Sequence, residues 1–133
     1  MATGKRVWTS ETFIEGDATP TFTTLSGTTE ELSSTVDMAT NGYDLVHIWP
    51  DVNFDATPTD DVWFRLYSSS DGGTDWDDVA FYEQLLDSAT DPQQILVVLK
   101  DPPPTWRAGF QQTGSTDSHD VRCSYKASNW SIA

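Results

Sequence analysis

The sequence predicts an all-β fold, an antiparallel β-sandwich of jelly-roll or immunoglobulin-like type with about seven or eight strands. Turn-forming residues (Gly, Pro, Asn and Asp) recur about every eight to twelve positions, as in sandwiches and barrels. The runs between them alternate apolar and polar residues, and none shows sustained helical periodicity. A chain of 133 residues fits one domain. We expect an extended N-terminal arm at residues 1–27 and a β-sandwich domain at residues 28–133.

Net charge limits the classes of partner. The chain has 21 acidic and 7 basic residues, for a formal charge of -14. Such a charge repels phosphate backbones and anionic lipid surfaces, so we expect no nucleic-acid partner and no membrane partner. The longest apolar run, ILVVL at 95–99, is far shorter than a membrane span, and no long apolar run follows the Lys5-Arg6 pair. We therefore expect a soluble protein without a signal peptide.

The first strands are marked by an Asn-Gly pair. Residues 3–27 mix isolated aromatics with Thr, Gly and Pro, which is typical of an extended arm or an edge strand. An alternating run at 32–38 is followed by Asn41-Gly42 and then by YDLVHIW at 43–49. An Asn-Gly pair between two such runs is a strong hairpin signal, because both residues accept positive φ. Pro50 is expected to end the second of these strands.

Three apolar segments follow. VWFRLYS at 62–68 predicts a strand whose core face is formed by Val62, Phe64 and Leu66. Residues 79–87 fit a helix with Val79, Tyr82 and Leu86 on one face, or a strand with Val79, Phe81 and Leu85 on one face. The unbroken apolar centre of QQILVVLK at 93–100 suits a strand covered on both faces.

The last two strands are predicted to form a hairpin. TWRAGFQQ follows three consecutive prolines, and HDVRCSYKA follows a polar turn. One face of this hairpin is apolar: Trp106, Ala108, Phe110, Val121, Cys123 and Tyr125. The opposite face carries Arg107, Arg122 and Lys126, which makes it less negative than the rest of the chain.

The acidic loop SSSDGGTDWDD at 68–78 is either a calcium site or a turn. Calcium takes six to eight oxygen ligands, and an EF-hand-type loop needs acidic or amide oxygens at alternating positions with a glutamate at the twelfth. Here two glycines follow Asp71 directly, and the twelfth position is Tyr82. Asp-Gly after a strand is ordinary turn chemistry, so we favour the turn, with Trp76 covering the edge of the core. A weak surface calcium ion stays open.

We predict no catalytic residues, no metal site and no cofactor. Asp51, Asp55, Asp60 and Asp61 could supply a glycosidase carboxylate pair, but in so acidic a chain a solvated loop is the simpler interpretation. His47 lies within an apolar strand and His119 lies at a turn, far apart in the sequence. Cys123 alternates with apolar residues and is expected to be a small buried hydrophobe. No nucleophile elbow, phosphate-binding glycine loop or Cys-x-x-Cys motif is present.

The tryptophans leave two interpretations open. Trp8, Trp49, Trp76 and Trp130 exceed what the core of one small sandwich needs. Aromatic side chains stack on sugars, and they also anchor protein interfaces. Packing at the rim of the core remains the simplest role for any single one of them.

Several turns carry a resemblance to a known family. VWFRLYSSSDGGTDWDD and ILVVLKDPPPTWRAGFQQTGSTDSHDVRCSYK resemble small β-sandwich structural proteins of tailed bacteriophages. Those proteins have an S-x-D-G turn, a D-x-P-x-x-[WFY]-R-[VA]-G strand and a T-G-[AS]-T-D turn in this order. The resemblance covers residues 60 to 126, about half of the chain.

The resemblance implies a virion component, a capsid decoration or cement protein on the outside of the icosahedral head. It implies binding to the major capsid protein, a homo-oligomer (trimer), and synthesis in the host cytoplasm. The contact residues that we predict are listed here: Lys5, Arg6, Trp8, Phe13, Arg107, Arg122 and Lys126. The first alternative is a carbohydrate-binding module of a phage tail or receptor-binding protein, using Trp49 and Trp76 with the aspartate loops. A small hydrolase with paired aspartates is a weaker alternative.

Overall fold

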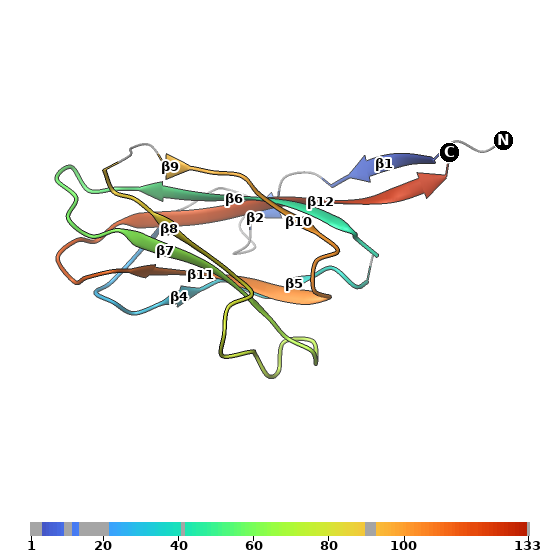
Figure 1. Cartoon of the computed structure of the whole chain (residues 1–133), viewed down its shortest axis with the longest axis horizontal. Coiled ribbons are helices and arrows are strands. Elements are labelled where there is room, and N and C mark those ends of the chain that lie inside the picture. Colours follow the sequence, from blue (N-terminus) through green and yellow to red (C-terminus); the bar gives the residue numbers. More distant parts are fainter. Residues whose placement is uncertain (1–3, 10–11, 14–21, 41, 90–92, 133) are drawn as a thin grey trace.

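The computed structural model describes residues 4–9, 12–13, 22–40, 42–89 and 93–132 (Figure 1). Within these ranges the chain is all-β, with twelve strands in two antiparallel sheets, as in a β-sandwich. Seven of the strands have four or more residues, and five are two-residue segments. No helix that could span a membrane is found in the described ranges.

Sheet 1 is built around β12 (Asp120–Ile132). On one side β12 pairs with β6 (Leu45–Asn53) over nine residues. On its other side it pairs in succession with β3 (Thr23–Thr24), β2 (Thr12–Phe13) and β1 (Gly4–Trp8). The far side of β6 pairs with β9 (Gln93–Gln94) and β10 (Val97–Lys100).

Sheet 2 is built around β11 (Thr105–Gln112). Seven residues of β11 pair with β7 (Val62–Ser68), which in turn pairs with β8 (Tyr82–Leu86). The other side of β11 pairs with β4 (Glu31–Leu32) and β5 (Val36–Asp37). β4 and β8 are therefore the outer strands of this sheet among the described residues.

The core lies between the sheets, and the predicted core faces are confirmed. Val62, Phe64 and Leu66 of β7 are fully buried, because alternate residues of a strand point to the same face. Trp106 and Tyr125 meet across the core with their ring centroids 5.7 Å apart. The other predicted residues of β11 and β12 also lie in the core: Ala108, Phe110, Val121 and Cys123.

The hairpin predicted at Asn41-Gly42 is wrong. β5 belongs to sheet 2 and β6 belongs to sheet 1, so the chain crosses between the sheets at this turn. Gly42 does adopt positive φ (61°), and Tyr43 N–H donates to the Met38 carbonyl oxygen. Asn41 lies outside the described residues. The positive φ expected at Gly42 is confirmed, but the turn joins two layers and not two neighbouring strands.

The hairpin predicted for the last two strands is also wrong. β11 pairs with strands of sheet 2 and β12 with strands of sheet 1. Arg107 therefore lies on the outer face of sheet 2, whereas Arg122 and Lys126 lie on the outer face of sheet 1. The single basic face that we expected from these three residues does not exist.

Three smaller expectations also change. β10 lies at an edge of sheet 1, and Val98 is 46% exposed, so this strand is not covered on both faces. Residues 82–86 form a strand, but Leu86 is the buried residue and Leu85 is exposed. β6 does not end at Pro50. Its pairing with β10 stops at Ile48 and its pairing with β9 starts at Asp51, so Pro50 lies between these two paired segments.

The described parts of the N-terminal segment are edge strands of sheet 1. β1 pairs with the last five residues of β12, and Leu25 is fully buried in the core. β6 ends its pairing at Ser128, so beyond this residue β1 and β12 continue as a two-stranded ribbon. Figure 1 shows this ribbon at one end of the molecule, where both chain termini lie.

Candidate functional site

The outer face of sheet 1 carries a strip of aromatic side chains, which we call the aromatic strip: Trp8, His47 and Trp49. The ring centroids of Trp8 and His47 are 4.6 Å apart, and those of His47 and Trp49 are 6.0 Å apart. His47 and Trp49 point outward because Val46 and Ile48, which alternate with them in β6, are fully buried, and Trp8 packs against His47 on the same face. Trp8 itself is 39% exposed. The strip therefore presents aromatic surface on the outer face of sheet 1.

Cations flank the aromatic strip. Arg6 Nη1 donates to Asp44 (2.7 Å) and to the Ser128 hydroxyl (2.8 Å), which fixes its position beside Trp8. The strand register places Lys126 opposite His47. The same outer face carries four of the chain's seven Lys and Arg residues: Arg6, Lys100, Arg122 and Lys126. In a chain of charge -14 this face therefore carries most of the positive charge.

Arg122 is held at the edge of this face by two contacts. Its Nε donates to an Asp51 carboxylate oxygen at 2.8 Å. Its guanidinium carbon lies 4.2 Å from the ring centroid of Phe22, a cation–π contact. Such a guanidinium is already ordered before any partner binds, which reduces the entropy lost on binding.

The structure brings together four of the seven predicted contact residues: Arg6, Trp8, Arg122 and Lys126. It places the backbone of Phe13 opposite Ser124 and that of Lys5 opposite Ser131, while their side chains lie outside the described part of the chain. Arg107 lies on the other side of the molecule. His47 and Trp49, which the prediction did not include, complete the strip.

The outer face of sheet 2 is occupied by a polar network around Arg65. Arg65 donates to Glu83 (2.7 Å), Glu30 (3.1 Å) and Gln111 (2.6 Å). The Tyr67 hydroxyl donates to Glu30, and burial together with this carboxylate raises the pKa of Tyr67. Because these side chains satisfy one another, the network is a structural clamp across β4, β7, β8 and β11.

The acidic loop at 68–78 is a turn, as favoured from the sequence. An Asp71 carboxylate oxygen accepts from Asp75 N–H (2.9 Å), Thr74 N–H (3.1 Å) and the Ser69 hydroxyl (2.8 Å), and these bonds lower the pKa of Asp71. Gly72 and Gly73 take positive φ. In the described chain, no group of three or more His, Cys, Asp or Glu side chains is arranged to hold a metal ion.

A shallow groove lined with hydroxyl groups runs beside this turn. It is bordered by residues of β5, the acidic loop and the start of β11: Thr35, Asp37, Thr40, Ser69, Ser70 and Thr105. Trp76 lies close to the groove, although the Arg107 guanidinium stacks 4.2 Å from its ring centroid. Trp76 therefore contacts Arg107 rather than covering the edge of the core.

Two buried aspartates, Asp60 and Asp117, hold two loops together by hydrogen bonds at one end of the sandwich, and we call this hydrogen-bonded group the lock. An Asp60 carboxylate oxygen accepts from the N–H groups of Thr116 and Asp117, both at 2.9 Å. An Asp117 carboxylate oxygen accepts from the N–H groups of Thr59 and Asp60, both at 2.7 Å. Each carboxylate thus binds the backbone of the other loop.

His119 completes this lock and is fully buried. Its Nδ1 accepts from Asp55 N–H at 3.1 Å, so its Nε2 carries the hydrogen and donates to the Asp60 carbonyl oxygen at 2.8 Å. Gln112 binds His119 N–H and the Asp117 carbonyl oxygen. His119, which the sequence places only at a turn, therefore has a structural role that the sequence does not indicate.

Acid is expected to destabilise the protein through this lock. Hydrogen bonds from Asp60 N–H and Thr59 N–H lower the pKa of Asp117 below its ordinary value of 3.8. A carboxyl group with a lowered pKa contributes stability above the unfolded-state pKa, and this contribution is lost as pH falls through the folded-state value. Urea unfolding should therefore show constant stability near neutrality and a decline below about pH 4.

The matched control is Asp117→Asn, which cannot titrate. Its stability should be lower at neutral pH and should change less than that of the wild type between about pH 4 and pH 2. Equal slopes for the two proteins over this range would show that Asp117 does not contribute to acid sensitivity.

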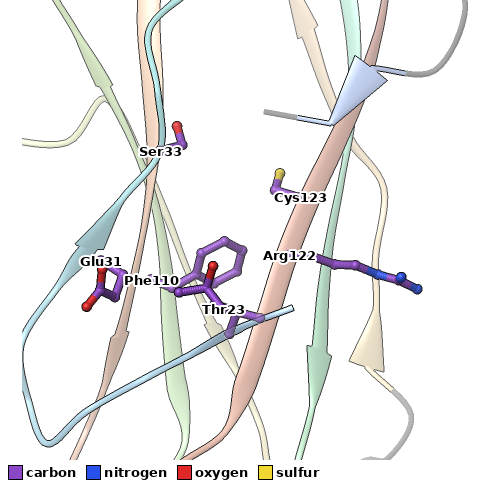
Figure 2. Close-up of a pocket in the computed structure, with 7 residues that line it drawn as sticks. Thr23, Glu31, Ser33, Phe110, Arg122 and Cys123 are labelled. Carbon is purple, nitrogen blue, oxygen red and sulfur yellow. The ribbon is translucent and has the colours of Figure 1, made fainter. Parts of the chain in front are cut away.

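Cys123 faces a small space between the edges of the two sheets (Figure 2). The space has a volume of about 10 Å³, enough for roughly one water molecule, and lies between β3 and β12 on one side and β4 and β11 on the other. In Figure 2 the Arg122 side chain points away from it. Burial raises the pKa of the Cys123 thiol well above its ordinary value, so the reactive thiolate is scarce.

Comparisons with known proteins add no assignment. No protein-family model matches the chain, and a search of curated proteins finds none that is significantly similar.

Proposed function

We propose that the protein is a non-enzymatic virion structural protein, a capsid decoration (cement) protein that binds the outer surface of a bacteriophage head. The observation that carries the proposal is the outer face of sheet 1. There the aromatic strip lies among Arg6, Lys126 and Arg122. Aromatic and arginine side chains dominate the energetics of protein interfaces, and lysine adds electrostatic steering. The major capsid protein is the proposed partner.

The distribution of charge supports binding with the outer face of sheet 1 toward the shell. The loops at both ends of the sandwich are acidic, and their carboxylates are engaged in turns, as for Asp71 and Asp117. An acidic exterior is unsuited to contact with packaged DNA and suited to the outer side of a shell. With sheet 1 against the shell, the acidic loops lie at the periphery of the contact.

The motifs of the resemblance have structural roles in this fold. In the T-G-S-T-D turn, Gly114 passes so close to Asp60 that a Cβ atom would lie 2.4 Å from the carboxylate oxygen. In the D-x-P-x-x-W-R-A-G strand, the Pro104 carbonyl oxygen accepts from Met38 N–H. These motifs thus specify a rigid sandwich, which supports a building-block role.

A binding protein of this kind stabilises the shell by mass action. A ligand that binds only the assembled head shifts the equilibrium away from disassembly, and many copies per particle multiply the effect. The resemblance implies a trimer and a virion location, and both belong to the proposal.

Binding to heads tests the proposal. We expect the purified chain to bind expanded heads made from the coat protein of the same phage, as measured by co-sedimentation. The double variant Trp8→Ala and Trp49→Ala should weaken binding by about 2 kcal/mol or more, roughly 30-fold, because interface tryptophans are frequent hot spots.

The control is Trp63→Ala, a partly buried tryptophan on the outer face of sheet 2. It should bind heads like the wild type. If the double variant binds heads as tightly as the control does, the outer face of sheet 1 is not the surface that contacts the head. No binding of the wild-type chain to heads would remove the proposed function itself.

The hydroxyl-lined groove favours a second candidate, a carbohydrate-binding module of a phage tail or receptor-binding protein. Hydroxyl and carboxylate groups beside an aromatic ring are common in sugar sites. Trp49 and Trp76 lie on opposite outer faces, however, so they cannot form one platform as first expected. A glycan array, read with and without a chelator, separates the candidates, because a cement protein should give no signal.

A further inference from the structure

β8 is an open edge of sheet 2. It pairs with β7 on one side, and no described strand pairs with its other side. The outer side of an edge strand presents N–H and C=O groups that are free to pair with another chain. Natural proteins usually protect such an edge with lysine, proline, a bulge or a very short strand.

Among the described residues, β8 has little protection against pairing with a strand of another chain. Its sequence, Tyr-Glu-Gln-Leu-Leu, has neither lysine nor proline. Its one charged residue, Glu83, is bound by Arg65 at 2.7 Å within the same sheet. Phe81 and Leu85 are each 40% exposed, and nearby Val79 is 80% exposed. This edge therefore combines unpaired backbone groups with exposed apolar side chains, and its one charged residue is paired within the same sheet.

We propose that two copies of the chain associate through β8, in antiparallel register about a two-fold axis at Gln84. This register pairs Glu83 with Leu85 of the partner subunit, and Tyr82 with Leu86 of the partner subunit. Leu85 then lies diagonal to the partner's Phe81, within reach of a large side chain. The two five-stranded sheets become one continuous sheet across the axis.

A second copy of the chain is the proposed partner at this edge, because an antiparallel edge strand can pair with an identical edge strand. An isologous contact uses the same patch on both subunits, so one exposed edge is sufficient. At the axis the two glutamines can exchange amide hydrogen bonds. The Arg65 guanidinium, which also binds Glu30, reduces the repulsion between Glu83 and the same residue of the partner subunit, which is diagonal to it in this register. This inference does not depend on the proposed function.

Net charge gives the contact a distinctive salt dependence. Each copy carries -14, so the two subunits repel each other at long range. Added salt screens this repulsion and leaves backbone pairing and apolar burial largely intact. Dimerisation should therefore strengthen with salt, whereas an association driven by opposite charges would weaken.

Sedimentation equilibrium of the full chain tests the contact. The wild type should approach twice its mass of 14.8 kDa with increasing concentration, and more readily at high salt. Leu85→Glu places a second carboxylate directly opposite Glu83 of the partner subunit and should raise the dimer dissociation constant at least tenfold. Leu32→Glu is the matched control, because Leu32 is also 40% exposed but lies in β4, across the same sheet. It should leave the constant unchanged.

Gln84→Cys tests the register separately. Under mild oxidation it should give a disulfide-linked dimer, while the wild type, whose one cysteine is buried, should not. A wild-type chain that stays monomeric at every salt concentration overturns the inference. So does equal weakening by Leu85→Glu and Leu32→Glu. None of these results affects binding to heads, which is measured independently.

Discussion

His119→Ala should lower the free energy of unfolding by about 2–4 kcal/mol. The imidazole ring is fully buried, and its removal leaves a cavity next to Phe54, whose ring centroid is 4.9 Å from that of His119. It also leaves Asp55 N–H and the Asp60 carbonyl oxygen without their partner. Urea unfolding followed by tryptophan fluorescence measures the change.

His47→Ala is the control for this experiment. His47 is partly exposed on the outer face of sheet 1, so its loss should cost less than about 1 kcal/mol. If the two variants are equally stable, the buried lock contributes nothing specific to the fold. A large loss from His119→Ala alone would establish the lock as the stabilising feature of this end of the sandwich.

Gly114→Ala should destabilise the protein by about 1–3 kcal/mol. The new Cβ atom would lie 2.4 Å from an Asp60 carboxylate oxygen, which is far closer than van der Waals contact. That carboxylate is buried and binds two N–H groups, so it cannot move without breaking those bonds. The cause is steric, because Gly114 does not require positive φ.

A double-mutant cycle with Asp60→Ala isolates this cause. If the clash with Asp60 is responsible, Gly114→Ala should cost little in the Asp60→Ala background. An undiminished cost in that background would assign the effect to the backbone of the turn and would refute the steric account.

The faces of the strands could be predicted from the sequence, but their partners could not. Alternation places Val62, Phe64 and Leu66 on one side of a strand whatever its neighbours are. Sheet membership depends on contacts between residues distant in sequence. The Asn41-Gly42 turn therefore looked like a hairpin although it crosses between sheets. The same holds for β11 and β12, whose polar connection also links the two sheets.

The same holds for the candidate site, where the residue types could be predicted from the sequence but their grouping in space could not. Arg6, Trp8, Arg122 and Lys126 could be selected by residue type, because the chain has only seven Lys and Arg residues and more tryptophans than its core needs. Their grouping with Trp49 depends on the pairing of β1, β12 and β6, which no local pattern encodes. The lock around His119 was missed because it joins residues about sixty positions apart. Its one visible signal was the glycine of the T-G-S-T-D turn.

Electron cryo-microscopy of the phage particle tests the central claim most directly. The account predicts density for the sandwich on the outer surface of the head, with the outer face of sheet 1 toward the coat protein and the acidic loops at the periphery. Heads that lack this density, or that carry it with sheet 1 facing solvent, would contradict the account.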